Sequence, residues 1–107
     1  MASQREELFL DMVRQFPESP MGHFSLGRLY LDEQRWAEAV AALSEAVRLD
    51  GTYAAALVSL GDASLGLGQR DQARAAWRRA LETPLGRRDH SLQSDLEQRL
   101  RDLDDFG

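Results

Sequence analysis

The chain contains few of the side chains that carry out nucleophilic or acid–base chemistry. It has no cysteine, which excludes disulfides, thiolate nucleophiles and cysteine-bound metals. Its two histidines are His23 and His90, and His90 is accompanied by Asp89 and, one turn further on, Asp95. A metal site needs a third or fourth converging ligand, and the sequence nominates none. We therefore expect no enzymatic activity, no metal site and no cofactor.

Anion binding is a second kind of chemistry that the residue spacing suggests. Arg70, Arg74 and Arg78 recur every four residues and would lie along one face of a helix. Three further arginines enlarge this basic region: Arg79, Arg87 and Arg88. The stripe could bind phosphates or an acidic protein, or it could be a solvated face partly neutralised by Asp71, Glu82 and the acidic segment 89–107. The net charge of −5 argues against nucleic acid as the main partner.

Length and composition are those of one small globular domain. The 107 residues are 43% hydrophobic and 29% charged, so wholesale disorder is not expected. No apolar run approaches the roughly 20 residues that span a bilayer. The acidic start has no signal-peptide core, which favours the cytoplasm and no membrane partner. The absence of Lys, Asn and Ile indicates the coding bias of a GC-rich, bacterial genome.

Helical periodicity runs through the whole chain. Ser3 and Glu6 form a capping-box pattern, and Ser19-Pro20 is a second start signal. Thr52 is expected to cap a later helix, while Gly66 and Gly68 mark a turn. Residues 83–86, Thr-Pro-Leu-Gly, are expected to interrupt the helical pattern. The helices that this pattern predicts span residues 3–16, 20 to 31 or 32, 36–49, 53–67, 70 to 81 or 82, and 91–105.

A pattern repeats at an offset of 34 residues. Leu26-Gly27 matches Leu60-Gly61, and other matched pairs are Ala39 with Ala73, Leu43 with Trp77, and Ala46 with Ala80. The spacing is His23-x2-Leu26-Gly27-x2-Tyr30…Ala39-x3-Leu43, then Leu57-x2-Leu60-Gly61-x2-Ser64…Ala73-x3-Trp77. This resembles the tetratricopeptide repeat. In that register His23 takes the usual tryptophan position and is interpreted as a packing residue.

The resemblance implies an all-α fold, an α-solenoid of about six helices in a right-handed superhelical stack. We expect a single domain over residues 1–107. Residues 20–53 and 54–87 would form two full repeats, with an N-terminal capping helix at 3–16 and a C-terminal capping helix at 91–105.

The resemblance also implies a binding groove on the concave side, lined by the first helix of each repeat. Carried over position by position, the groove contains Met21, Phe24, Arg28, Leu31, Asp32, Ala55, Val58, Asp62, Leu65 and Gly66. Seven of them are our candidate partner-binding residues: Met21, Phe24, Arg28, Leu31, Val58, Asp62 and Leu65. Arg28 is expected to pair with Asp62. Phe24 is either an exposed anchor or part of the core, and a terminal helix could fold back to fill the groove.

Binding of a protein or peptide partner is the function that these features favour. The alternative is a self-assembling homodimer, joined through a heptad-like seam of Leu92, Leu96, Leu103 and Phe106. The same leucines could instead pack on the second repeat. A third hypothesis is anion or nucleic-acid binding through the arginine stripe.

Overall fold

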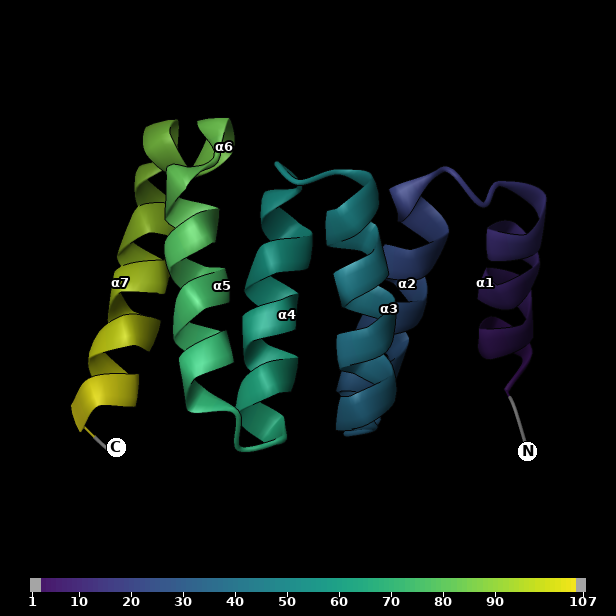
Figure 1. Ribbon diagram of the computed structural model, residues 1–107, viewed down its shortest axis with the longest axis horizontal. Helices are drawn as coiled ribbons and strands as arrows, with labels where there is room; N and C mark the ends of the chain where they lie inside the picture. Colours follow the sequence, from purple (N-terminus) through teal and green to yellow (C-terminus); the bar gives the residue numbers. More distant parts are fainter. Residues whose placement is uncertain (1–2, 106–107) are drawn as a thin grey trace.

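A computed structural model describes residues 3–105, and within this range the chain forms seven helices and no strand (Figure 1). The helices are α1 (Gln4–Gln15), α2 (Pro20–Asp32), α3 (Trp36–Leu49), α4 (Ala54–Gly66), α5 (Arg70–Glu82), α6 (Pro84–Arg88) and α7 (His90–Asp105). Their order and positions confirm the all-α prediction.

Consecutive helices pack side by side into two layers. The pairs α2–α3 and α4–α5 are the most extensively packed, while α3–α4 and α2–α4 contacts join the two pairs. In Figure 1, α3 and α5 face the viewer, α2 lies behind α3, and α1 and α7 stand at opposite ends. The extents of 39 × 28 × 19 Å agree with this, because two packed helix layers are about 20 Å thick. We call the layer formed by α2, α4 and α7 the inner row.

Two glycines at equivalent repeat positions bring the paired helices together. A Cβ added to Gly27 would lie 2.4 Å from Cγ of Leu43, and one added to Gly61 would lie 2.1 Å from Nε1 of Trp77. Leu43 and Trp77 are themselves almost completely buried. Each repeat therefore places one large side chain of its second helix directly against a glycine of its first.

The core consists of two clusters. One lies between α2, α3 and α4 and includes Leu26, Leu43 and Ala63; the other lies around Trp77 and Leu57. Leu96 and Leu103 of α7 are buried members of the second cluster. The C-terminal helix is thus part of the stack rather than an appendage on its surface.

Some helix-start signals form as predicted and others do not. Ser3 Oγ accepts the N–H of Glu6 at 3.1 Å, and Ser19 Oγ accepts the N–H of Met21 at 3.3 Å. The Glu6 carboxylate does not complete the capping box, because it bonds to Tyr30 and Arg35 instead. Thr52 is no cap either: its hydroxyl donates to Asp50, and α4 begins after Tyr53.

Residues 83–86 end α5 at Glu82, as predicted, but the prediction missed a short helix there. They begin the short helix α6, in which Thr83 Oγ1 accepts the N–H of Gly86 at 3.0 Å. Pro84 occupies the first turn, where a missing N–H costs nothing. The Thr83-Pro84 pair, which indicates the end of one helix, therefore also begins the next one.

The turns inside the two repeats share a left-handed residue. Gln34 has φ of 59° and Gly68, its equivalent 34 positions later, has φ of 78°. Side chains in this region cost about 1–2 kcal/mol, whereas glycine does not. Gly66, predicted to belong to the turn, instead ends α4 and makes room for the ring of Trp36, because an added Cβ would lie 2.3 Å from Cδ2 of that ring.

Replacing Gln34 with glycine is expected to stabilise the protein by about 0.5–1 kcal/mol. Relief of the left-handed strain exceeds the extra chain entropy that glycine loses on folding. Urea unfolding of the variant measures this difference. Gly68→Ala is the matched control and should destabilise by about 1 kcal/mol; a neutral result for both would show that neither turn is strained.

Candidate partner-binding face

The candidate partner-binding residues differ widely in exposure. Met21 is 61% exposed and Leu65 is 42% exposed, which is high for large apolar side chains. Leu31 and Val58 are half-buried and pack against the two core clusters. Met21 and Leu65 are therefore the apolar groups among them that a partner could reach most easily.

Phe24 is mainly a packing residue. Its ring lies 4.9 Å from that of Tyr53, centroid to centroid, and it touches both core clusters. It is half-buried, so only part of it faces solvent. Substitution of Phe24 would disturb the core as well as the surface, and it is a poor probe of binding.

Polar contacts join the helices of the inner row. Arg28 of α2 donates to Ser59 Oγ of α4 at 3.3 Å and lies 3.8 Å from Asp32. Asp62 of α4 accepts two hydrogen bonds from Arg99 of α7, at 2.9 and 3.1 Å. The predicted Arg28–Asp62 pair is therefore wrong, because the bidentate guanidinium of α7 takes the Asp62 carboxylate.

The Arg99 contacts make α7 a continuation of the inner row. Hydrogen bonding to Asp62 raises the pKa of the Arg99 guanidinium above its ordinary value despite partial burial. Asp95, one turn earlier on α7, also pairs with Arg99. The sequence alone did not reveal this link, although continuing the row of first helices into residues 90–105 would have placed Arg99 near α4.

A pocket of about 360 Å³ lies where α4, α5 and α7 meet. Its walls come from all three helices: Asp62, Leu65, Arg70, Trp77, Arg99, Asp102 and Leu103. Two of the candidate residues, Asp62 and Leu65, are among them. Arg70 and Leu103 had been assigned instead to the arginine stripe and the α7 seam. The remaining three, Trp77, Arg99 and Asp102, were not predicted as site residues, because spacing in the sequence does not show that they converge.

The terminal helices pack at the ends of the stack. α1 packs on α2, and α7 packs on α5 and α6. Figure 1 shows both helices standing parallel to their neighbours at opposite ends. Within residues 3–105, neither terminal helix lies lengthwise over α2 and α4, so the inner row is not filled by folding back.

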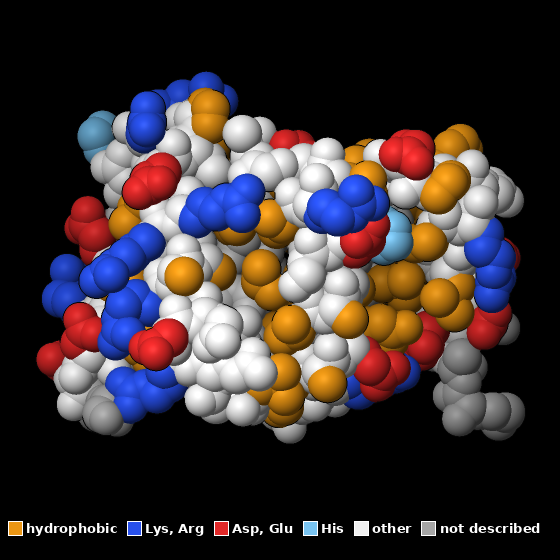
Figure 2. Space-filling model, in the orientation of Figure 1, with side chains coloured by type: hydrophobic (Ala, Val, Ile, Leu, Met, Phe, Trp, Pro, Cys, Tyr) orange, Lys and Arg blue, Asp and Glu red, His pale blue; other side chains and the backbone are white. Residues whose placement is uncertain are grey.

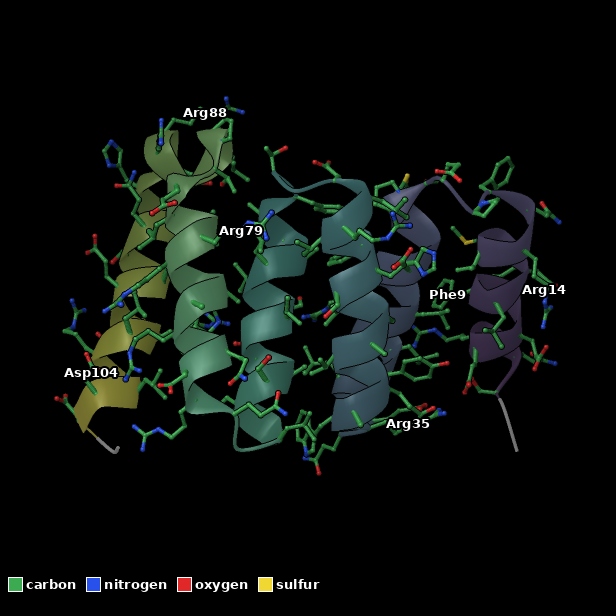
Figure 3. All side chains as sticks on the ribbon, in the orientation of Figure 1. Phe9, Arg14, Arg35, Arg79, Arg88 and Asp104 are labelled. Atoms are coloured by element: carbon green, nitrogen blue, oxygen red, sulfur yellow. The ribbon has the colours of Figure 1, made fainter. Side chains whose placement is uncertain are left out.

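One arginine anchors α1 to the first repeat. Arg35 binds Glu6 of α1 at 2.8 Å and Glu38 at 2.6 Å, and its guanidinium stacks 4.4 Å from the Tyr30 ring. Tyr30 also donates to Glu6 at 3.1 Å. Figure 3 shows Arg35 at the end of α3, on the side towards α1, with Phe9 between the helices. These bonds, above all the one from Arg35, lower the pKa of Glu6.

The attachment of α1 should therefore weaken in acid. A carboxylate whose folded pKa lies below its ordinary 4.5 contributes stability above that value and loses it as the pH falls through the folded pKa. We expect the protection factors of α1 amides, which correct for the intrinsic pH dependence of exchange, to fall between about pH 5 and 3. Glu6→Gln should raise exchange at pH 7 and remove much of this pH dependence. A parallel response in both proteins would exclude Glu6 as the titrating group.

The arginine stripe is largely committed to contacts inside the chain. Arg70 donates to the Leu103 carbonyl, and Arg74 binds Asp71 at 3.1 Å and Asp104 of α7 at 2.8 Å. Arg79 donates to the Gly51 carbonyl at 3.3 Å. Two stripe members thus hold α7 on α5, which favours the neutralised-face interpretation.

The leucines of the heptad-like seam in α7 pack against the second repeat of the same chain. Leu96 and Leu103 are buried, while Leu92 and Leu100 pack against the same cluster. Phe106, the last residue of the predicted seam, lies outside the described residues. The described part of the seam leaves little apolar surface for a second copy.

The opposite face of the stack carries its own shallow apolar groove. Figure 2 shows hydrophobic side chains gathered between α3 and α5, over α4. A pocket of about 270 Å³ there includes Val40, Leu57, Leu60 and Ala76. Figure 3 shows Arg79 beside it. This α3–α5 face provides positions for control substitutions.

The histidines do not assemble a reactive site. His23 is half-buried in α2, and His90 is the exposed first residue of α7. Within residues 3–105, no group of three or more His, Asp or Glu side chains is placed to hold a metal. In the same range, no helix combines the length and apolar character needed to cross a bilayer.

Comparison with known proteins identifies the fold. The tetratricopeptide repeat model matches residues 30–96, more than half of the chain. The chain belongs to the tetratricopeptide repeat (TPR) family. No curated protein is similar enough in sequence to count as a relative.

Two solved structures illustrate the TPR likeness. Protein BPP2914 from Bordetella parapertussis, solved in solution, is 30% identical with a TM-score of 0.77; the match covers 96% of this chain and 89% of that protein. The first TPR of Spaghetti (RPAP3), bound to the HSP90 peptide SRMEEVD, is 18% identical with a TM-score of 0.71. That match covers 98% of this chain and 94% of the other. The family assignment confirms the resemblance drawn from the 34-residue offset.

Proposed function

We propose that this TPR protein is a protein–protein interaction scaffold that binds a peptide or helix of its partner along the inner row. The observation that carries the proposal is the pocket beside Leu65, which brings an exposed apolar side chain and a concave surface together on this row. Met21 extends the apolar surface onto α2. α1 and α7 would serve as capping helices that close the ends of the stack.

The family and one structural neighbour support this role. Helical repeats generally use extended concave surfaces for binding. The TPR of Spaghetti was solved with a peptide bound, so a stack of this size and shape can hold a peptide. The scaffold would act by binding rather than by catalysis, with Arg28, Asp62 and Arg99 as polar groups along the same face.

Capture from a lysate tests this function. The bait is the wild-type protein, and the variants are Met21→Asp and Leu65→Asp, which change the inner row at two large, exposed apolar side chains. Ala75→Asp is the matched control, because Ala75 is exposed on α5 and lines the α3–α5 groove instead. We expect a partner that is retained by Ala75→Asp and lost from both inner-row variants.

The other outcomes are equally informative. Retention of the partner by Met21→Asp and Leu65→Asp, with loss from Ala75→Asp, would place binding on the α3–α5 face and contradict the proposal. Recovery of tagged and untagged copies of the same chain alone would indicate self-assembly. Circular dichroism of each variant confirms that the helices are retained before binding is compared.

A further inference from the structure

We propose that the pocket between α4, α5 and α7 receives an arginine or lysine side chain of the partner. The inference deepens the proposed function, on which it rests, by assigning a chemistry to one subsite. Its occupant would be a basic side chain on an otherwise apolar segment, with the cation held by Asp102.

The walls of the pocket suit the stem of a long side chain. Leu65, Leu103 and Trp77 line the pocket from α4, α7 and α5 respectively, and Leu65 is the exposed member, since Leu103 and Trp77 are almost fully buried. Leu65 remains 42% exposed, so surface is left for a partner to cover. Arginine and lysine bury their methylene stems against apolar groups while keeping the charge at the rim. The volume of about 360 Å³ is sufficient for a single side chain to enter.

The charged side chains of the pocket favour an occupant that carries a positive charge. Arg99 is held by Asp62 and Asp95, and Arg70 donates to the Leu103 carbonyl. The two arginines of the pocket are thus accompanied by three carboxylates, those of Asp62, Asp95 and Asp102, and the local charge sums to −1. Asp102 accepts its hydrogen bond, at 2.8 Å, from the neutral Gln98 amide. Its negative charge is therefore available to an incoming cation.

Other occupants fit these surroundings less well. An acidic side chain would approach both Asp62 and Asp102 without an uncommitted arginine to receive it. A purely apolar side chain would contact Leu65 and Leu103. It would, however, displace water from the Asp102 carboxylate without offering a hydrogen-bond donor in its place. A basic side chain satisfies the apolar walls and the carboxylate together.

Nuclear magnetic resonance titration of the whole chain tests the proposal. The probes are N-acetyl-arginine methylamide, N-acetyl-norleucine methylamide, which has a similar apolar stem without charge, and N-acetyl-glutamate methylamide. The reporters are the Leu65 and Leu103 amides and the Trp77 indole N–H, which donates to the Val58 carbonyl at 3.2 Å. The proteins are wild type, Asp102→Asn, and Glu97→Gln, an exposed α7 control outside the pocket.

The arginine probe should shift these reporters saturably and bind more tightly than the other two. Asp102→Asn should weaken it by about fivefold, as for one exposed charge contact, whereas Glu97→Gln should leave its affinity nearly unchanged. Equal affinity of the norleucine probe, insensitivity to Asp102→Asn, or absence of shifts at the reporters would each overturn the inference. If partner capture still depends on Leu65 in that case, the proposed function stands without this subsite.

Discussion

Replacing Gly61 with alanine is expected to destabilise the protein by about 3 kcal/mol, measured by urea unfolding. The added Cβ would lie 2.1 Å from Nε1 and 2.4 Å from Cδ1 of Trp77. Trp77 is 2% exposed and its indole N–H is bonded to the Val58 carbonyl, so the ring has little room to withdraw. The helices α4 and α5 would have to separate instead, which disrupts the second repeat.

Two further variants identify the cause of the Gly61 effect. Gly51→Ala should change stability by less than about 0.5 kcal/mol, because its Cβ meets only the flexible end of Arg79, at 2.8 Å. Trp77→Phe, combined with Gly61→Ala, should recover part of the lost stability by shortening the opposing ring. A stable Gly61→Ala protein, or a double variant no better than the sum of its parts, would contradict the close-approach explanation.

Replacing Leu96 with alanine should cost about 2–5 kcal/mol of global stability. Leu96 is fully buried and packs in the cluster that contains Trp77 and Leu57. Its truncation would leave a cavity between α7 and the second repeat. Because α7 also holds Asp62 through Arg99, the variant should loosen the α4–α7 side of the pocket as well.

A control variant and hydrogen exchange test whether α7 unfolds together with the second repeat or separately from it. Leu85→Ala is the control at a 40% exposed position, with an expected change below about 0.5 kcal/mol. Hydrogen exchange should show loss of protection in α5 and α7 together. If only α7 loses protection and the stability of α2–α5 is unchanged, the terminal helix is an independent attachment.

The fold was predictable because its main determinants are local or periodic. Gly27 with Leu43 and Gly61 with Trp77 recur at the same spacing, and each pair forms the close helix contact that the pattern indicates. The α3 bounds, Trp36–Leu49, agree with the predicted helix. Gln34 could have been recognised only by aligning it with Gly68, since glutamine has no special preference for left-handed turns.

The candidate site was less accessible to sequence reasoning. Family register nominated Leu65 and Asp62, but the partners that shape their surroundings come from α5 and α7. Asp62 was assigned to Arg28, whereas Arg99 lies closer in the folded chain and approaches in bidentate geometry. Glu6 similarly matched a local capping pattern but bonds to Arg35, 29 residues away. Competition between a local and a distant partner is decided by packing, which residue spacing does not specify.

Site-specific photocrosslinking tests the central claim most directly. A benzophenone amino acid is placed singly at Met21 or Leu65 on the inner row, and at Ala41 or Ala75, exposed positions of α3 and α5. We expect Met21 and Leu65 to crosslink the same partner protein and Ala41 and Ala75 to give no crosslink to it. Crosslinks to a partner from Ala41 or Ala75 alone would contradict partner binding along the inner row and place the interaction on the opposite face.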